Sequence, residues 1–277
     1  MKVPILGVSR NRKVFFVMQT NKIVAAHIVC FVSLWLGCAG LIPQDMYYNI
    51  AMTPVLPEGK GEYQVDPDDP KRVILSHEGM RVAVRPYTDD ELNELYPPLT
   101  DGRHVNPYTT NELDIGLGYV PPVFTVFKVE VVNDTYAKIE FNPANTLLTT
   151  DTGRELRYFD PGRAGEGVET GGGNRFSAYY QTERGRSGLD KDTNLERMGL
   201  IYKTAFHRFR PVFRGDGRSG TLSFASLPND ATSVLLVVSD FALAFDASGN
   251  PEHVIDFQFK FSVEQGVVTS GVAPVDE

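Results

Sequence analysis

Cysteine is almost absent from this sequence: its two cysteines, Cys30 and Cys38, both lie within the first 38 residues. No disulfide or thiolate metal site can therefore form beyond Cys38. Histidine is also scarce, and no two histidines have the i, i+4 spacing of a helical zinc site. We expect a fold that needs neither disulfides nor metal, and we predict no cofactor.

Basic charge is in short supply. The formal net charge is −8, and residues 1–37 contain five basic side chains and no acidic one, which leaves −13 for the rest. A surface this acidic is repelled by nucleic acid and by anionic lipid headgroups. The composition therefore argues against a nucleic-acid partner, and attachment to a membrane would need a covalent anchor.

Recognisable catalytic motifs are missing as well. There is no Gly-x-Ser-x-Gly motif, and Ser187 and Ser219 lie in Gly-Arg-Ser-Gly, which is typical of a turn. The glycine-rich residues 160–188 lack the Gly-Lys-Ser/Thr ending of a phosphate-binding loop. We predict a non-enzymatic protein without catalytic residues. A hydrolase is the alternative, because dispersed acidic side chains can meet in the fold.

The sequence does contain one long apolar run, residues 23–37, preceded by Lys22. Its length suits the apolar part of a signal peptide and is short for a membrane span. Residues 34–40, Leu-Trp-Leu-Gly-Cys-Ala-Gly, resemble the lipobox of bacterial lipoproteins. An uncleaved N-terminal anchor and cleavage by an ordinary signal peptidase are the alternatives.

The resemblance to bacterial lipoproteins implies that residues 1–37 are a signal peptide and that Cys38, the residue after the cut, carries the lipid. This lipid would attach the protein to the membrane. In enterobacterial lipoproteins, a residue other than Asp after the cysteine favours the outer membrane, and here that residue is Ala39. We therefore expect a lipid-anchored protein of the cell envelope, in the outer membrane if the organism has one.

Proline is frequent in the residues that follow. Residues 38–71 contain five prolines, together with glycines and aspartates that favour turns. We predict a proline-rich tether over this range. At roughly 3 Å per residue, such a tether would let the folded part reach tens of ångströms from the membrane.

Residues 72–265 have the alternating pattern of half-buried antiparallel strands. The pattern is clearest in Thr125–Val132 and in His253–Glu264, where phenylalanines occupy alternate positions. Thr88–Glu91 has the spacing of a capping box, which predicts that a helix begins there. About eight such strands predict a mainly β protein with an antiparallel two-sheet sandwich. We expect residues 266–277 to form a flexible tail.

A helical insertion is expected at about residues 174–207, between the middle strands of the sandwich. Leu195, Met198 and Tyr202 recur at helical spacing. This recurrence predicts that they face the core, with Arg197 on the outside of the helix.

Loose motifs in residues 123–264 resemble the immunoglobulin-like domains of many bacterial surface lipoproteins. The motifs are Val126–Val132 followed by Asn133-Asp134, Asn142-Pro-Ala-Asn145, Thr150-Asp-Thr-Gly153, and a glycine-rich turn before a strand that ends at Leu227-Pro228. The resemblance implies an immunoglobulin-like antiparallel sandwich. It supplies no catalytic residues, because a fold does not determine a function.

Arginine is concentrated between residues 175 and 218, in contrast to the acidic remainder. Arg208, Arg210 and Arg214 lie close to Tyr202 in the sequence, and arginine and tyrosine are enriched at binding hot spots. We predict a binding surface there for an envelope protein or a glycan, although pairing with nearby acidic residues is the alternative. Three functions follow as hypotheses: a binding or assembly module, a carbohydrate- or polymer-binding module, and a hydrolase.

Overall fold

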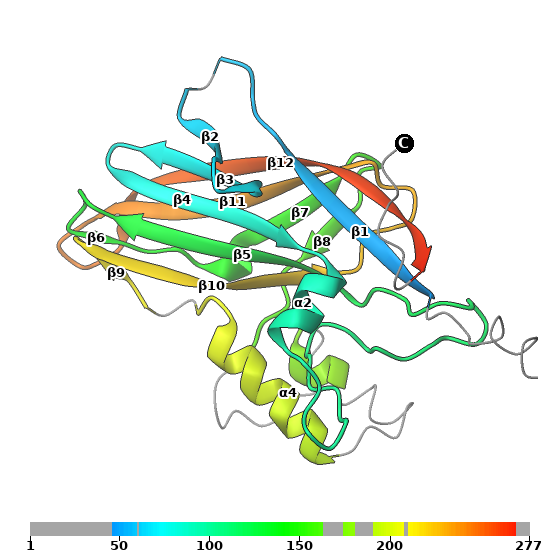
Figure 1. Ribbon diagram of the computed structural model, residues 1–277. Coiled ribbons are helices and arrows are strands. Elements are labelled where there is room, and N and C mark those ends of the chain that lie inside the picture. Colours follow the sequence, from blue (N-terminus) through cyan, green and yellow to red (C-terminus); the bar gives the residue numbers. More distant parts are fainter. Residues whose placement is uncertain (1–45, 60, 163–173, 181–190, 208–209, 270–277) are drawn as a thin grey trace, which may run out of the picture. The chain divides into compact units, whose positions relative to one another are not determined.

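The computed structural model describes residues 46–59, 61–162, 174–180, 191–207 and 210–269, which belong to one compact unit that begins at Asp45 (Figure 1). The expected signal peptide, Cys38, Arg208 and most of the expected tail lie outside the described residues. No helix in the described part of the chain combines the length and the apolar character needed to cross a membrane.

Two five-stranded sheets form the body of the fold, and every strand pairing within them is antiparallel. In spatial order the first sheet contains β1 (Met46–Val55), β12 (Pro251–Thr269), β11 (Ser233–Phe245), β7 (Thr146–Thr150) and β8 (Glu155–Arg157). The second contains β10 (Asp216–Ala225), β5 (Phe124–Asn133), β4 (Met80–Tyr87), β3 (Asp69–His77) and β2 (Tyr63–Asp66). The prediction of a mainly β, antiparallel fold is therefore confirmed.

Shorter elements complete the fold. β6 (Lys138–Ile139) and β9 (Val212–Phe213) pair with each other, and η2 (Pro143–Asn145) is a single 3₁₀ turn that precedes β7. The two longer helices are α2 (Asp89–Leu95), between β4 and β5, and α4 (Lys191–Thr204), between β8 and β9. Residues 176–180 are also helical.

Both sheets contribute to one apolar core. Phe257, Phe259 and Phe261 of β12 are buried, as the alternation in the sequence predicts. The Phe261 ring contacts Phe127 of β5, with 5.6 Å between ring centroids, so the first and second sheets meet through aromatic side chains. Burial of apolar surface is the dominant favourable contribution to folding, and each large ring buries much of it.

The predicted tether is wrong for residues 46–71, because β1, β2 and the start of β3 occupy most of that range. β1 pairs with β12 over ten residues, from Met46 opposite Thr269 to Val55 opposite Lys260. Since β1 is an edge strand, Pro54 can be accommodated in it. The same pairing extends β12 to Thr269, into residues that we expected to be a flexible tail.

A second apolar cluster lies on the other face of β5. Phe124 and Val126 belong to this cluster, whereas Phe127 and Val129 belong to the core between the sheets, as the period of two along a strand requires. The remaining buried members come from α2, α4 and the segments near them: Leu92, Tyr108, Phe176, Tyr180 and Ile201. α2 and α4 are therefore held against the second sheet (Figure 1).

The two helices differ in how well the sequence predicted them. The capping box at the start of α2 is confirmed, since the Glu91 backbone N–H donates to Thr88 Oγ1 and the Thr88 N–H donates to Glu91 Oε2. On α4 the predicted inward face is right for Met198, which packs against the second apolar cluster, and wrong for Leu195, which is 61% exposed, and for Arg197, which is buried. The guanidinium of Arg197 donates from Nε and Nη2 to the backbone carbonyl of His104 at 3.2 and 2.8 Å, so two of its N–H groups have a partner inside the fold.

Gly220 of β10 allows the chain after α4 to approach the sheet. A Cβ at this position would lie 2.5 Å from the Phe206 backbone. We expect Gly220→Ala to lower the free energy of unfolding by about 2 kcal/mol, because the backbone must shift to relieve this clash. Urea denaturation measures the change.

The matched control for this prediction is Gly217→Ala on the same strand. There a Cβ would have its nearest neighbour, Val132 Cγ2, at an ordinary distance of 3.5 Å. Equal destabilisation by the two substitutions would show that the close approach at Gly220 is not what matters.

Candidate functional site

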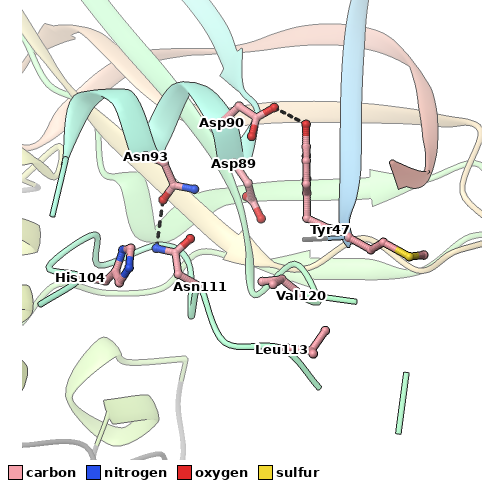
Figure 2. Close-up of a pocket in the computed structure, with 9 residues that line it drawn as sticks. Tyr47, Asp89, Asp90, Asn93, His104, Asn111, Leu113 and Val120 are labelled. Atoms are coloured by element: carbon pink, nitrogen blue, oxygen red, sulfur yellow. Dashed lines mark hydrogen bonds between the residues drawn. The ribbon is translucent and has the colours of Figure 1, made fainter. Parts of the chain in front are cut away.

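An open pocket of about 340 Å³ lies where the start of β1, the first turn of α2 and the long segment between α2 and β5 come together (Figure 2). Long segments without regular structure are often functional in compact folds. The residues that line the pocket are Met46, Tyr47, Asp89, Asp90, Asn93, His104, Asn111, Leu113 and Val120.

Asp89 is the most perturbed acidic group among the described residues. Its side chain points from α2 toward the segment that carries Asn111 and Val120 (Figure 2). Burial removes the carboxyl group from water and, together with the neighbouring charge of Asp90, raises its pKa to about 7. The group therefore exchanges its proton near neutral pH, which is common for functional carboxyl groups.

Asp90, the next residue, faces β1 instead. The hydroxyl of Tyr47 donates to Asp90 Oδ2 at 2.6 Å, and this hydrogen bond raises the pKa of Tyr47 to about 12. The two acidic side chains therefore have different environments. Both line the pocket, but Asp90 is partnered by a tyrosine hydroxyl, whereas the pKa of Asp89 is raised mainly by burial.

Asn93 fixes the wall of the pocket opposite β1. Its Oδ1 accepts hydrogen bonds from Asn106 Nδ2 at 2.8 Å, Thr109 Oγ1 at 3.1 Å and Asn111 Nδ2 at 3.1 Å. Asn111 has a positive φ of 54°, a conformation that asparagine adopts more readily than most residues. These contacts attach the segment to α2, so the pocket is formed before any ligand binds.

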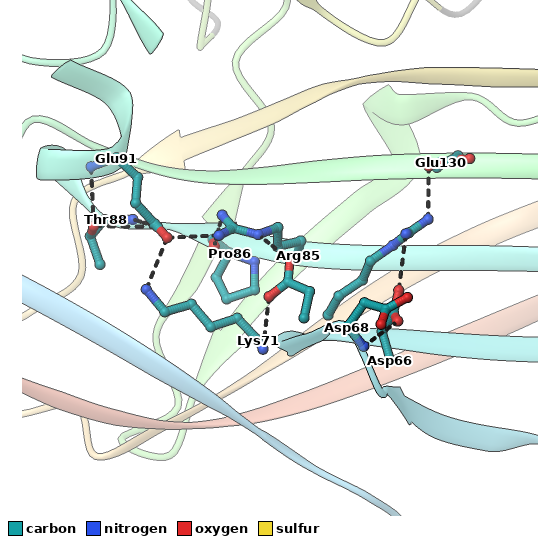
Figure 3. A network of polar contacts seen from close by, with 10 residues as sticks. Asp66, Asp68, Lys71, Arg85, Pro86, Thr88, Glu91 and Glu130 are labelled. Carbon is teal, nitrogen blue, oxygen red and sulfur yellow. Dashed lines mark hydrogen bonds and ion pairs between the residues drawn. The ribbon is translucent and has the colours of Figure 1, made fainter. Parts of the chain in front are cut away.

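A network of ion pairs positions α2 on the second sheet (Figure 3). Arg85 of β4 donates to Asp69 at 2.6 Å and to Glu91 at 2.7 Å, and Lys71 is 3.0 Å from the same Glu91 oxygen. Burial alone would raise the pKa of Glu91, but hydrogen bonds from Arg85, the Thr88 backbone and Lys71 lower it to about 2. Glu91 therefore takes part in the capping box and also pairs with Arg85 and Lys71 of the second sheet. Together these contacts fix the first turn of α2, which carries Asp89.

Chemically, the pocket offers amide groups, a tyrosine and a carboxyl group that can donate or accept a hydrogen bond near neutral pH. Such a set suits a neutral polar ligand, because the acidic charge disfavours anions. It also brings two carboxyl groups of unequal environment to one place, as a hydrolase would require. In the described residues, no group of three or more His, Asp or Glu side chains could hold a metal ion.

The residues predicted as a binding surface lie elsewhere. Arg214 is exposed, and its Nε donates to the backbone carbonyl of Thr135 at 2.8 Å. Tyr202 is exposed on α4, where its ring packs against His207 with 4.8 Å between centroids. Arg210 is also exposed. Of the described members of this set, none lines the pocket, so the arginine surface stays a separate prediction.

Sequence reasoning missed the pocket because its residues have other ordinary explanations. Acidic residues in the first turn of a helix are favoured by the helix dipole, which accounts for Asp89 and Asp90 without any site. The capping box did locate this turn correctly. The pairing of β1 that brings Tyr47 to α2 had no comparable signal in the sequence.

None of the protein-family models, curated proteins or solved structures with which the chain was compared matches it.

The raised pKa of Asp89 predicts how stability changes with pH. Because the folded-state value of about 7 exceeds the ordinary value of 3.8, the stability that Asp89 contributes in its protonated form is lost as the pH rises from about 4 through 7. Asp89→Asn does not titrate, so we expect it to become more stable than wild type over this range. The gain should be on the order of 1 kcal/mol, because the side chain keeps some contact with water.

Thermal unfolding of both proteins between pH 4 and pH 8 measures this difference. The control is Glu94→Gln, which removes an exposed acid from the same helix. If Asp89→Asn and Glu94→Gln differ from wild type by the same amount at every pH, the buried environment of Asp89 is not responsible.

Proposed function

We propose that this protein is a lipid-anchored, non-enzymatic binding module of the cell envelope, and that it binds a neutral polar ligand such as a glycan in the pocket beside α2. The observation that carries the proposal is the Asp89 carboxyl group, which lies in the pocket with a pKa of about 7. Burial of a carboxyl group costs folding free energy, and residues that lower stability are frequent at binding sites.

The other contacts of the pocket favour the same ligand class. Asn93 and Asn111 are hydrogen-bonded to each other, so their orientation is fixed before binding. Fixed polar groups reduce the entropy that is lost on association. A glycan offers neutral hydroxyl groups that match such donors and acceptors, whereas a phosphate would meet the charge of Asp90.

The location and the finer fold belong to this proposal as well. The lipobox resemblance of residues 34–40 supports attachment through Cys38 to a membrane of the cell envelope. Two antiparallel sheets that share one core support an immunoglobulin-like sandwich, with α4 and the helical residues near it as an insertion between strands. An envelope protein that binds the arginine surface would be compatible with this arrangement.

Hydrolysis is the second candidate function, because one observation favours it. Asp89 and Asp90 line the same pocket in different environments, and a carboxyl group with a pKa near 7 beside another carboxylate is suited to general acid catalysis. The two candidates differ in whether the protein releases reducing ends from an oligosaccharide.

Calorimetry tests whether the pocket binds a glycan. The ligands are soluble neutral oligosaccharides, namely oligomers of N-acetylglucosamine and oligomers of maltose. We expect Asn111→Ala to weaken binding about tenfold, which corresponds to roughly 1.4 kcal/mol, because it removes one fixed amide and loosens the wall. Glu94→Gln is the matched control on the exposed side of α2. If both variants bind as wild type does, the pocket is not the site.

Hydrolysis is tested with the same oligosaccharides. If wild type releases reducing ends and Asp89→Asn does not, hydrolysis is favoured instead.

The lipid anchor is tested separately by the intact mass of the protein recovered from native membranes. We expect a chain that starts at Cys38 and carries added acyl mass, because the lipobox directs cleavage and acylation at that residue. Cys38→Ala should lose this mass. A full-length chain without acyl groups would contradict the lipoprotein proposal.

A further inference from the structure

Three large apolar side chains are exposed within one short loop. Leu113 is 57% exposed, Ile115 93% and Leu117 51%. Single exposed apolar residues are ordinary, but a cluster on a surface usually marks an interaction site. We refer to residues 113–117 as the apolar loop.

The apolar loop has a defined turn that presents these side chains to the surroundings. Asp114 Oδ1 accepts hydrogen bonds from the backbone N–H groups of Gly116 at 2.8 Å and Leu117 at 3.0 Å. The Gly118 N–H donates to the Asp114 carbonyl at 2.7 Å. The loop is thus closed by its own polar groups, and its apolar side chains take no part in that closure.

The apolar loop lies beside the start of β1. The Val120 N–H donates to the Met46 carbonyl at 2.8 Å, and the Tyr48 N–H donates to the Val120 carbonyl at 3.0 Å. Met46 is itself exposed, as is Val267, which lies opposite Tyr48 in β12. Exposed apolar side chains therefore gather at the end of the fold where the described chain begins.

The length of chain between this end and the proposed anchor is short. Eight peptide steps separate Cys38 from Met46, and a fully extended chain spans at most about 3.6 Å per residue, or about 29 Å in total. A tether up to residue 71 would have allowed a much greater distance, but β1 begins at Met46. A lipid on Cys38 would therefore keep the apolar loop near the bilayer surface.

We propose that Leu113, Ile115 and Leu117 insert into the surface of the membrane to which Cys38 is anchored. This inference rests on the lipid anchor of the proposed function. Transfer of apolar side chains from water to the boundary between headgroups and acyl chains is favourable. Tyr119, which follows the loop, packs against the buried Tyr48 with 5.7 Å between ring centroids, so the base of the loop is attached to the core.

The charge of the loop specifies the kind of lipid surface. Asp114 lies within the loop and Glu112 precedes it. These acidic groups would be repelled by anionic headgroups, so the surface is a zwitterionic one. The pocket shares Met46, Leu113 and Val120 with this end of the fold, so it would open close to the membrane.

The test uses the acylated product that begins at Cys38, with a single added thiol. Ile115→Cys is suitable because the side chain is almost fully exposed, and an acylated Cys38 offers no competing thiol. An environment-sensitive fluorophore on this thiol is measured in phosphatidylcholine vesicles with and without a quencher attached to the lipid acyl chains. We expect a blue shift of the emission and loss of intensity with the quencher.

The matched control is Val254→Cys, another exposed apolar position. Val254 precedes Val267 by 13 residues on β12, which is about 43 Å at 3.3 Å per residue. Its label should keep the emission of an aqueous environment in the same vesicles and remain insensitive to the quencher.

Each alternative outcome decides the inference. If the protein is bound through Cys38 but the Ile115 label stays in water, the inference is wrong while the lipid anchor stands. If the label is shielded without vesicles, another part of this chain or a second copy covers the loop, and the inference is again wrong. If intact mass shows no acylation, the proposed anchor fails. Ile115→Cys is then labelled in a chain that also carries Cys30→Ser and Cys38→Ser, so that no other thiol competes. A blue shift with added vesicles supports membrane insertion of the loop, and its absence overturns it.

Discussion

The ten-residue pairing of β1 with β12 is the constraint on which the rest of the arrangement depends. It closes one edge of the first sheet with residues from the beginning of the described chain. It places Tyr47 beside Asp90 and attaches residue 120 to Met46, so the same strand forms part of the pocket and supports the apolar loop. It also limits the chain between Cys38 and the folded part to a few residues, which sets the distance to any lipid on that cysteine.

The position of α2 depends on electrostatics as much as on apolar packing. Leu92 anchors the helix in the second apolar cluster, and Glu91 ties its first turn to Arg85 of the sheet. Partly buried pairs of this kind are worth more than exposed ones because water screens them less. The consequence is a fixed helix N-terminus that holds Asp89 in the pocket, where its charged form is disfavoured. The contacts that hold α2 in place therefore offset the free-energy cost of burying the Asp89 carboxyl group in the proposed site.

Local patterns predicted the parts of the fold that local physics decides. The alternation in β12 gave the buried face of Phe257, Phe259 and Phe261, and the capping box gave the start of α2. Prediction failed where a distant partner outweighs local preference. The five prolines of residues 38–71 suggested a tether, yet β1 is an edge strand and accepts Pro54. The stripe on α4 suggested a buried Leu195, yet the carbonyl of His104 satisfies Arg197 on that face instead.

The sequence by itself determined a cysteine-poor, acidic, mainly β chain with an N-terminal segment that resembles a lipoprotein signal, because composition and periodicity are local properties. Only the tertiary structure decided that Tyr47, Asp89 and Asn111 share a pocket and that the apolar loop lies beside the first strand. The physical reason is that a pKa, a pocket and an exposed patch depend on which distant residues exclude water from a given side chain. That information resides in the pairing of β1 with β12 and in the contacts of α2, neither of which leaves a periodic signal in the chain.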